Sequence, residues 1–222
     1  MLDFLAQAYY RFKVPLFEWK EQQWVARQFY HDAAFKALDQ ELLSGPNPYI
    51  SAKVFPYGET PLRALYAMAQ AIDLKPTDHF VDLGCGRGRA VFFLSRFFGC
   101  QATGIDLTPS FIHKAERLAK NHRQKKVTFL CQDFTSYDFQ EASCVYLYGT
   151  TYSDECLAKL EDKLLQLPEG SRIVTVSEPL KNFRFAHELE VLFAWGKGSV
   201  FLHTSPACSP SLNPRASHLQ LS

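Results

Sequence analysis

The sequence predicts an α/β fold in which a doubly wound, mostly parallel sheet ends in an antiparallel hairpin. Between about residue 60 and residue 176, short apolar runs alternate with amphipathic helical patterns, which is the order of βαβ units. The last two apolar runs, 190–195 and 199–203, have no helical pattern between them and are joined by Gly196-Lys-Gly198. This pair of runs predicts a hairpin with its turn at those three residues.

Five parallel strands are expected before the hairpin, with glycines or capping residues at the ends of the intervening helices. The strands are expected at 79–83, 102–106, 127–131, 144–148 and 172–176. A helix at 89–98 should end at Gly99, because glycine readily adopts the left-handed conformation that closes a helix. A second helix should begin with Pro109 after Thr108, and a third should be capped by Ser153 and end at 168–170.

Length and composition are those of an ordinary globular domain. The chain has 222 residues, of which 47% are hydrophobic and 21% charged, and its formal net charge of +1 argues against a nucleic-acid-binding surface. Its six cysteines form no C-x-x-C pair, so we expect buried thiols in a reducing compartment and no metal site. Because neither a membrane span nor a secretory signal is evident, a cytoplasmic location is expected.

The chain divides into three parts by composition. Residues 1–56 are rich in aromatic side chains and are expected to form a helical cover, packed at the sheet edge or acting as a lid over the site. Residues 57–204 contain the alternating strands and helices, and they are the predicted ligand-binding domain. Residues 205–222 hold several prolines and serines and are expected to form a flexible C-terminal tail.

A glycine-rich loop follows the first predicted strand and leads into a helix, which is where doubly wound sheets bind nucleotides. Gly84, Gly86 and Gly88 form a G-x-G-x-G pattern, and glycines allow the backbone to approach a ligand closely. Arg89 stands where a dinucleotide-binding loop needs a small residue. Asp82 disfavours a pyrophosphate and favours a ligand with a cationic amine. These residues argue against a nicotinamide dinucleotide.

Two more acids end the next two strands. Asp106 lies about 20 residues beyond the loop, where a carboxylate can accept both ribose hydroxyls. Asp133 ends the third strand and can accept a hydrogen bond from an adenine amino group, while Phe134 stacks on the ring. An adenosine that carries an α-amino acid fits all these groups.

With these motifs the chain resembles the class I S-adenosylmethionine-dependent methyltransferases, from Tyr57 to Thr204. The resemblance implies a seven-stranded Rossmann-like sheet, S-adenosyl-L-methionine as cofactor and S-adenosyl-L-homocysteine as product. It places Asp82 at the methionine part, Asp106 at the ribose and Asp133 at the adenine. The cofactor-binding residues that it implies are Glu59, Thr60, Asp82, Gly84, Cys85, Gly86, Gly88, Asp106, Leu107, Gln132, Asp133, Phe134 and Tyr148.

Further segments resemble two groups of protein lysine methyltransferases. Tyr57-Gly-Glu-Thr60 and the ending 198–204 are similar to segments of the Dot1-type enzymes. The stretch 160–170 is similar to the helix before the fifth strand of the FAM173-related enzymes. The chain differs at 148–152, where Tyr148-Gly-Thr-Thr-Tyr152 replaces the Asn pair of Dot1-type enzymes. The resemblance implies a protein lysine as methyl acceptor.

Methyl transfer from a sulfonium is an in-line displacement, so the protein has chiefly to align the two reactants and exclude water. A lysine acceptor must also lose its proton, which a dry aromatic wall promotes. The candidates for this wall are Tyr146, Tyr148, Tyr152 and Phe134. Tyr148 is the best placed and is a predicted catalytic residue.

Glu59 is the second predicted catalytic residue, because it could contact the methionine ammonium or the acceptor amine. Two alternatives to protein-lysine methylation stay open. The acceptor could be a small molecule, or the chain could be a non-catalytic module that binds S-adenosylmethionine.

Overall fold

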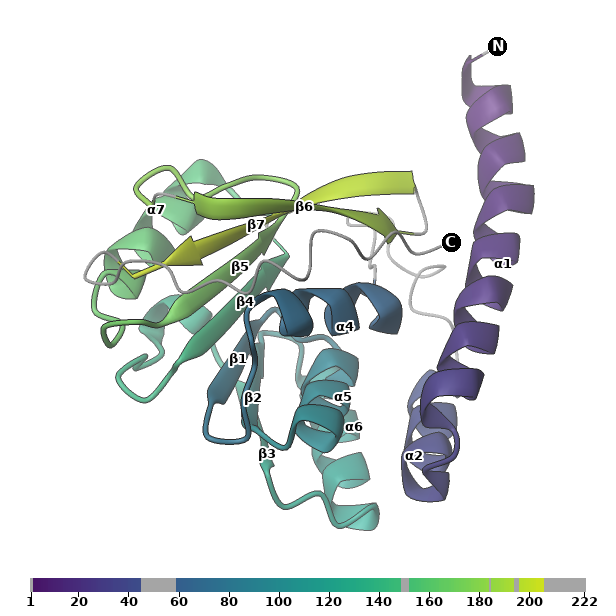
Figure 1. The fold of residues 1–222 in the computed structure, drawn as a ribbon, viewed down its shortest axis with the longest axis horizontal. Coiled ribbons are helices and arrows are strands. Elements are labelled where there is room, and N and C mark those ends of the chain that lie inside the picture. Colours follow the sequence, from purple (N-terminus) through teal and green to yellow (C-terminus); the bar gives the residue numbers. More distant parts are fainter. Residues whose placement is uncertain (1, 45–58, 149–151, 184, 194–195, 206–222) are drawn as a thin grey trace.

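The computed structural model describes residues 2–44, 59–148, 152–183, 185–193 and 196–205, with the side chains of residues 2–15 and 185 left out. A seven-stranded sheet runs through the molecule, with helices on both faces (Figure 1). Its strands are β1 (His79–Leu83), β2 (Gln101–Asp106), β3 (Val127–Cys131), β4 (Cys144–Tyr148), β5 (Arg172–Val176), β6 (Phe185–Phe193) and β7 (Gly196–Thr204). The helices are α1 (Leu2–Phe29), α2 (Ala33–Leu43), α4 (Leu62–Ala71), α5 (Arg89–Phe98), α6 (Pro109–Asn121), the short 3₁₀ helix η1 (Phe134–Ser136) and α7 (Asp154–Leu164).

The strand order β3-β2-β1-β4-β5-β7-β6 confirms the predicted fold class. The first five strands are parallel, and β7 runs antiparallel to both β5 and β6. After β1 the chain builds β2 and β3 on one side and then crosses to place β4 on the other. The carboxyl ends of β1 and β4 therefore flank the point where an open sheet of this kind has its ligand crevice.

The central strands β1, β2, β4 and β5 are buried on both faces, as parallel strands covered by helices must be, whereas the edge strand β3 is largely half-buried or exposed. Side chains alternate between the two faces: Phe80 and Tyr146 belong to a hydrophobic cluster shared with α2, α4, α5 and α6. Val81 and Val145 belong to a second cluster on the other face, shared with α7. Because Asp82 has the parity of Phe80, it projects on the face covered by α4 and α5.

Most helix ends follow the sequence signals. α5 ends at Gly99, whose φ is +72° and whose N–H donates to the Ser95 carbonyl. α6 begins at Pro109. The Ser153 hydroxyl accepts a hydrogen bond from the Cys156 N–H at the start of α7. α7 ends at Leu164, earlier than the predicted end at 168–170, because the next residues form a tight turn with a Leu167 N–H bond to the Leu164 carbonyl.

The predicted hairpin is present, but the prediction that its turn lies at 196–198 is wrong. Phe193 pairs directly with Gly196, so the two glycines and Lys197 belong to β7. Gly196 has a φ of +131°, a conformation that glycine adopts without strain, and this allows the strand to start there. Residues 194 and 195, which were expected to end the preceding strand, lie outside the described residues.

The described N-terminal helices pack on other helices. α1 contacts α4, while α2 contacts α5 and α6. Figure 1 shows α1 along one side of the molecule, with its first turns extending beyond the rest of the described chain. The remainder of the expected cover (45–56) and nearly all of the expected tail (206–222) lie outside the described residues. In the part of the chain that the structure describes, no helix is both long and apolar enough to cross a bilayer.

Candidate cofactor and active site

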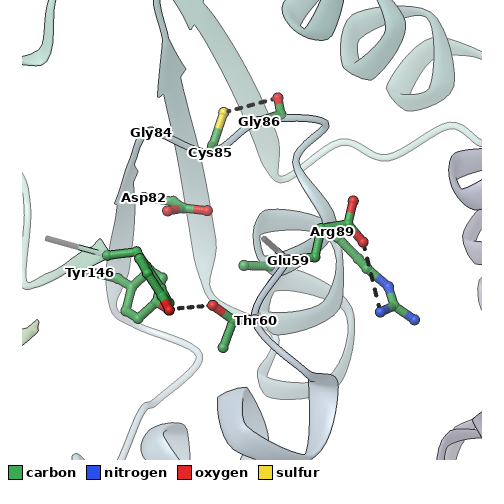
Figure 2. Close-up of a pocket in the computed structure, with 10 residues that line it drawn as sticks. Glu59, Thr60, Asp82, Gly84, Cys85, Gly86, Arg89 and Tyr146 are labelled. Carbon is green, nitrogen blue, oxygen red and sulfur yellow. Dashed lines mark hydrogen bonds and ion pairs between the residues drawn. The ribbon is translucent and has the colours of Figure 1, made fainter. Parts of the chain in front are cut away.

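A small cavity of about 50 Å³ lies at the carboxyl ends of β1 and β4, beside the glycine loop. Figure 2 shows the Asp82 carboxyl facing the space between this loop and the pair formed by Thr60 and Tyr146. The cavity is lined by Glu59, Thr60, Asp82, Gly84, Cys85, Gly86, Arg89, Ala90, Tyr146 and Tyr148. Seven of the predicted cofactor-binding residues are in this set.

Asp82 is a buried carboxyl group with no partner among the described residues. Its relative exposure is 4%, and no described residue donates a hydrogen bond to it. Burial raises its pKa to about 8, and repulsion by the nearby Asp106 adds to the effect. A buried carboxylate is costly without a partner, so this position suits a ligand that brings a cationic group.

The glycine loop is fastened to the end of β2. The N–H groups of Gly84 and Cys85 donate to the Ile105 carbonyl at 2.8 and 3.0 Å. The Gly86 N–H donates to Asp106 Oδ2 at 2.9 Å, and the Thr108 N–H donates to Asp106 Oδ1 at 2.8 Å. Asp106 therefore braces the loop from β2, and its carboxylate oxygens have further lone pairs for a ligand hydroxyl.

The remaining predicted cofactor-binding residues lie outside the cavity lining. Leu107 is 68% exposed, beside Asp106 at the end of β2. At the end of β3, Asp133 accepts hydrogen bonds from the Thr135 N–H and hydroxyl, both at 2.8 Å. Gln132 is half-buried and Phe134 is buried. Gly88 precedes α5, and a Cβ added there would overlap the Phe129 ring.

Two hydroxyls form the side of the cavity opposite the loop. Thr60 Oγ1 and the Tyr146 hydroxyl share a buried hydrogen bond of 2.5 Å. Tyr148 is half-buried at the end of β4, with its ring edge-on to Phe193 at 6.3 Å. Burial raises the pKa of the Tyr148 hydroxyl far above its usual value, so this group stays protonated and is not a general base at neutral pH.

Sequence reasoning missed a buried network of arginines and acids beside the cavity. Arg87 donates to Glu59 Oε1 through both Nε (3.0 Å) and an Nη (2.6 Å). Arg89 forms a bidentate ion pair with Asp39 of α2, in which its Nε and one Nη donate to the two carboxylate oxygens at 2.8 and 3.0 Å. Its other Nη lies 3.9 Å from Glu59 Oε2. The two arginines at alternate positions of Gly86-Arg-Gly-Arg89 were the available signal, but their partners lie about 30 and 50 residues away.

Asp82, the glycine loop and the two later aspartates together fit an S-adenosyl ligand. Asp82 offers the amino group of the methionine part a carboxyl group that no described residue pairs with. Gly84 has a φ of +81° and, having no side chain, allows a ligand to approach the backbone closely. Asp106 and Asp133 follow at the ends of the next two strands, in the order that the ribose and the adenine require.

Comparison with known proteins agrees with this chemistry. The ANTKMT methyltransferase domain matches residues 82–186. The structure of an RNA methyltransferase from Salinibacter ruber in complex with S-adenosyl-L-homocysteine has a TM-score of 0.60 and 27% identity, over 70% of this chain and 99% of that one. The chain carries a class I S-adenosylmethionine-dependent methyltransferase domain.

Relatives of this methyltransferase domain act on different acceptors. A histone-lysine N-methyltransferase of Caenorhabditis elegans, H3 lysine-79 specific, is 29% identical over 138 residues, which are 55% of this chain and 15% of that protein. Norajmaline N-methyltransferase of Rauvolfia serpentina is 25% identical over 114 residues, which are 51% of this chain and 38% of that protein. The chain thus spans well under half the length of both relatives.

Proposed function

We propose that this protein transfers a methyl group from S-adenosylmethionine to the side-chain nitrogen of a protein lysine. The observation that carries the cofactor part is the buried Asp82 carboxyl group beside the glycine loop, which has no partner among the described residues. The lysine part is supported by the aromatic residues at the end of β4 and by the histone-lysine relative.

Different residues around the cavity would contact different parts of the cofactor. Asp82 would hold the amino group of the methionine part, and Arg89 supplies a positive charge to the same cavity. Asp106 would hold the ribose, and Asp133 and Phe134 the adenine. When bound, the cofactor supplies a methyl group on a positively charged sulfur, already activated for transfer to a nucleophile.

The acceptor must reach the site as a neutral amine. A lysine ammonium has a pKa of about 10.4 in water, and burial against apolar walls lowers that pKa. Tyr148 lines the cavity and offers it an aromatic side chain, whose ring packs edge-on against the buried Phe193. Glu59 lines the cavity too, with its carboxylate paired to Arg87. Contact of Glu59 with the methionine ammonium or the acceptor amine stays a prediction.

Replacing Asp82 tests the cofactor site. In Asp82→Asn the carboxyl group that pairs with the ligand amino group is lost, so we expect the dissociation constant of S-adenosylhomocysteine to rise at least tenfold. This corresponds to about 1.4 kcal/mol, within the range for a charged hydrogen bond. Isothermal titration calorimetry measures it, with the exposed Asp162→Asn on α7 as the matched control. Equal affinities for the Asp82 and Asp162 variants would contradict the assignment.

The acceptor class can be tested by transfer of a deuterated methyl group. Purified protein is incubated with labelled S-adenosylmethionine and either a lysate protein fraction or a metabolite extract, and mass spectrometry locates the label. Label on lysine side chains supports the proposal. Label only in small molecules would favour the alternative suggested by the norajmaline N-methyltransferase relative. Binding without transfer to either fraction would favour a non-catalytic module.

A further inference from the structure

Tyr152 follows β4 in the chain, but its side chain lies at the carboxyl edge of the sheet beside the glycine loop. It directly precedes Ser153, the N-cap of α7, and so belongs to the connection that follows β4. Its ring packs edge-on against Phe134, with the ring centres 5.0 Å apart and the planes at 89°. A residue that follows β4 therefore contacts the segment that follows β3.

The Tyr152 hydroxyl lies directly against Gly84. A Cβ added to Gly84 would overlap that oxygen, so the two residues are in close contact. Burial raises the pKa of the Tyr152 hydroxyl, and the negative charges of Asp106 and Asp82 raise it further. These effects place the hydroxyl among the strand ends where the cofactor is expected to bind.

A bound nucleoside would need the same space. A ligand with its amino group at Asp82 and its adenine at Phe134 has to pass over Gly84, which lies between them along the carboxyl edge. The cavity of about 50 Å³ has room for a few water molecules but not for an adenosine. Tyr152 contacts both Gly84 and Phe134 and so lies on this path.

We propose that Tyr152 is a further residue of the cofactor site, which competes with the nucleoside for the edge of Phe134 and must swing away from Gly84 before the nucleoside can bind. This inference rests on the proposed cofactor binding. Because the ring contact with Phe134 has to be broken, the tyrosine weakens the affinity for the nucleoside. Binding and release of the nucleoside then both require the same movement of the Tyr152 side chain.

The first test is the affinity of S-adenosylhomocysteine for Tyr152→Ala, measured by calorimetry. Because an edge-to-face ring contact no longer has to be broken, we expect binding to be about 2- to 10-fold tighter than in the unaltered protein. Tyr137→Ala is the matched control: Tyr137 is also half-buried and packs edge-on against a phenylalanine, Phe139, at 5.1 Å. Its affinity should stay within twofold. An unchanged or weaker affinity in Tyr152→Ala would overturn the proposal.

The second test needs no substitution. In protein with selectively labelled phenylalanine and tyrosine, nuclear Overhauser contacts between the Phe134 and Tyr152 rings should be present at first and disappear when S-adenosylhomocysteine saturates the protein. Contacts that persist at saturation overturn the proposal. The proposed function fails separately: if the unaltered protein binds no S-adenosylhomocysteine, the cofactor assignment and this inference fall together, whereas binding with the ring contact intact removes this inference alone.

Discussion

Asp82 is the side chain whose protonation we expect to couple most directly to ligand binding. Its carboxyl group is buried near Asp106, and its pKa is about 8 because burial and that neighbour both disfavour the charged form. At pH 6.5 the group is therefore mostly protonated. An α-amino group, by contrast, is still mostly cationic at this pH. The ammonium favours the carboxylate form of Asp82, so binding should expel the carboxyl proton.

This coupling predicts that S-adenosylhomocysteine binds more tightly as the pH rises from 6 toward 8, with nearly one proton released per ligand at pH 6.5. Calorimetry in two buffers of different ionisation enthalpy gives the number of protons released. Asp82→Asn should release none. A proton release close to zero in the unaltered protein would show that Asp82 does not pair with the ligand ammonium.

The interaction between α2 and α5 links the N-terminal region to the candidate cofactor cavity. Asp39 of α2 is only 1% exposed in its side chain and binds Arg89, which lines the cavity at the start of α5. The Tyr30 hydroxyl donates to the same carboxylate at 2.9 Å. Arg87 reaches from the glycine loop to the Leu42 carbonyl at 3.1 Å. α2 therefore forms part of the support for the glycine loop.

Asp39→Asn should destabilise the protein strongly, because it leaves Arg89 buried with its main counter-charge removed. The expected loss in the free energy of unfolding is about 3–5 kcal/mol, the usual cost of breaking a buried ion pair from one side. Chemical denaturation measures this loss. Glu155→Gln, which breaks the exposed pair with Lys159 on α7, is the control and should leave the unfolding curve unchanged. A small effect of Asp39→Asn would mean that α2 is held by its apolar contacts alone.

For the molecule as a whole, the proposed site joins three strands of one sheet. Asp82, Asp106 and Asp133 come from the ends of β1, β2 and β3, and the sheet separates two hydrophobic clusters that pack on opposite faces. A ligand that contacts all three strand ends binds the folded sheet and not the unfolded chain. Its binding free energy should therefore appear as added stability of the domain.

At a concentration one hundred times its dissociation constant, S-adenosylhomocysteine should stabilise the protein by about 2.7 kcal/mol. For a chain of 222 residues this raises the melting temperature by about 5–10 °C. Differential scanning fluorimetry measures the shift, and Asp82→Asn at the same ligand concentration should show a smaller one. Absence of any shift in the unaltered protein would contradict ligand binding at the strand ends.

The parts of the fold that depend on local signals could be predicted from the sequence. The five parallel strands follow from short apolar runs, and the ends of α5 and α6 from Gly99 and Pro109. The hairpin turn was misplaced, because glycine by itself favours a turn, whereas Gly196 and Gly198 here belong to a strand. Pairing of Phe193 with Gly196, which involves the neighbouring strand, decides between the two.

The candidate site too could be predicted only in part from local sequence signals. Periodicity and spacing alone were enough to bring Asp82, Asp106 and the glycine loop to one edge of the sheet, because parallel strands carry their carboxyl ends to the same side. Three relations follow from three-dimensional packing: the pairing of Arg89 with Asp39, the contact of Tyr152 with Gly84, and the lack of a partner for Asp82 within the described part of the chain. These contacts involve residues far apart in the chain. Local hydrophobic periodicity and secondary-structure propensity do not predict which distant side chains will be in contact.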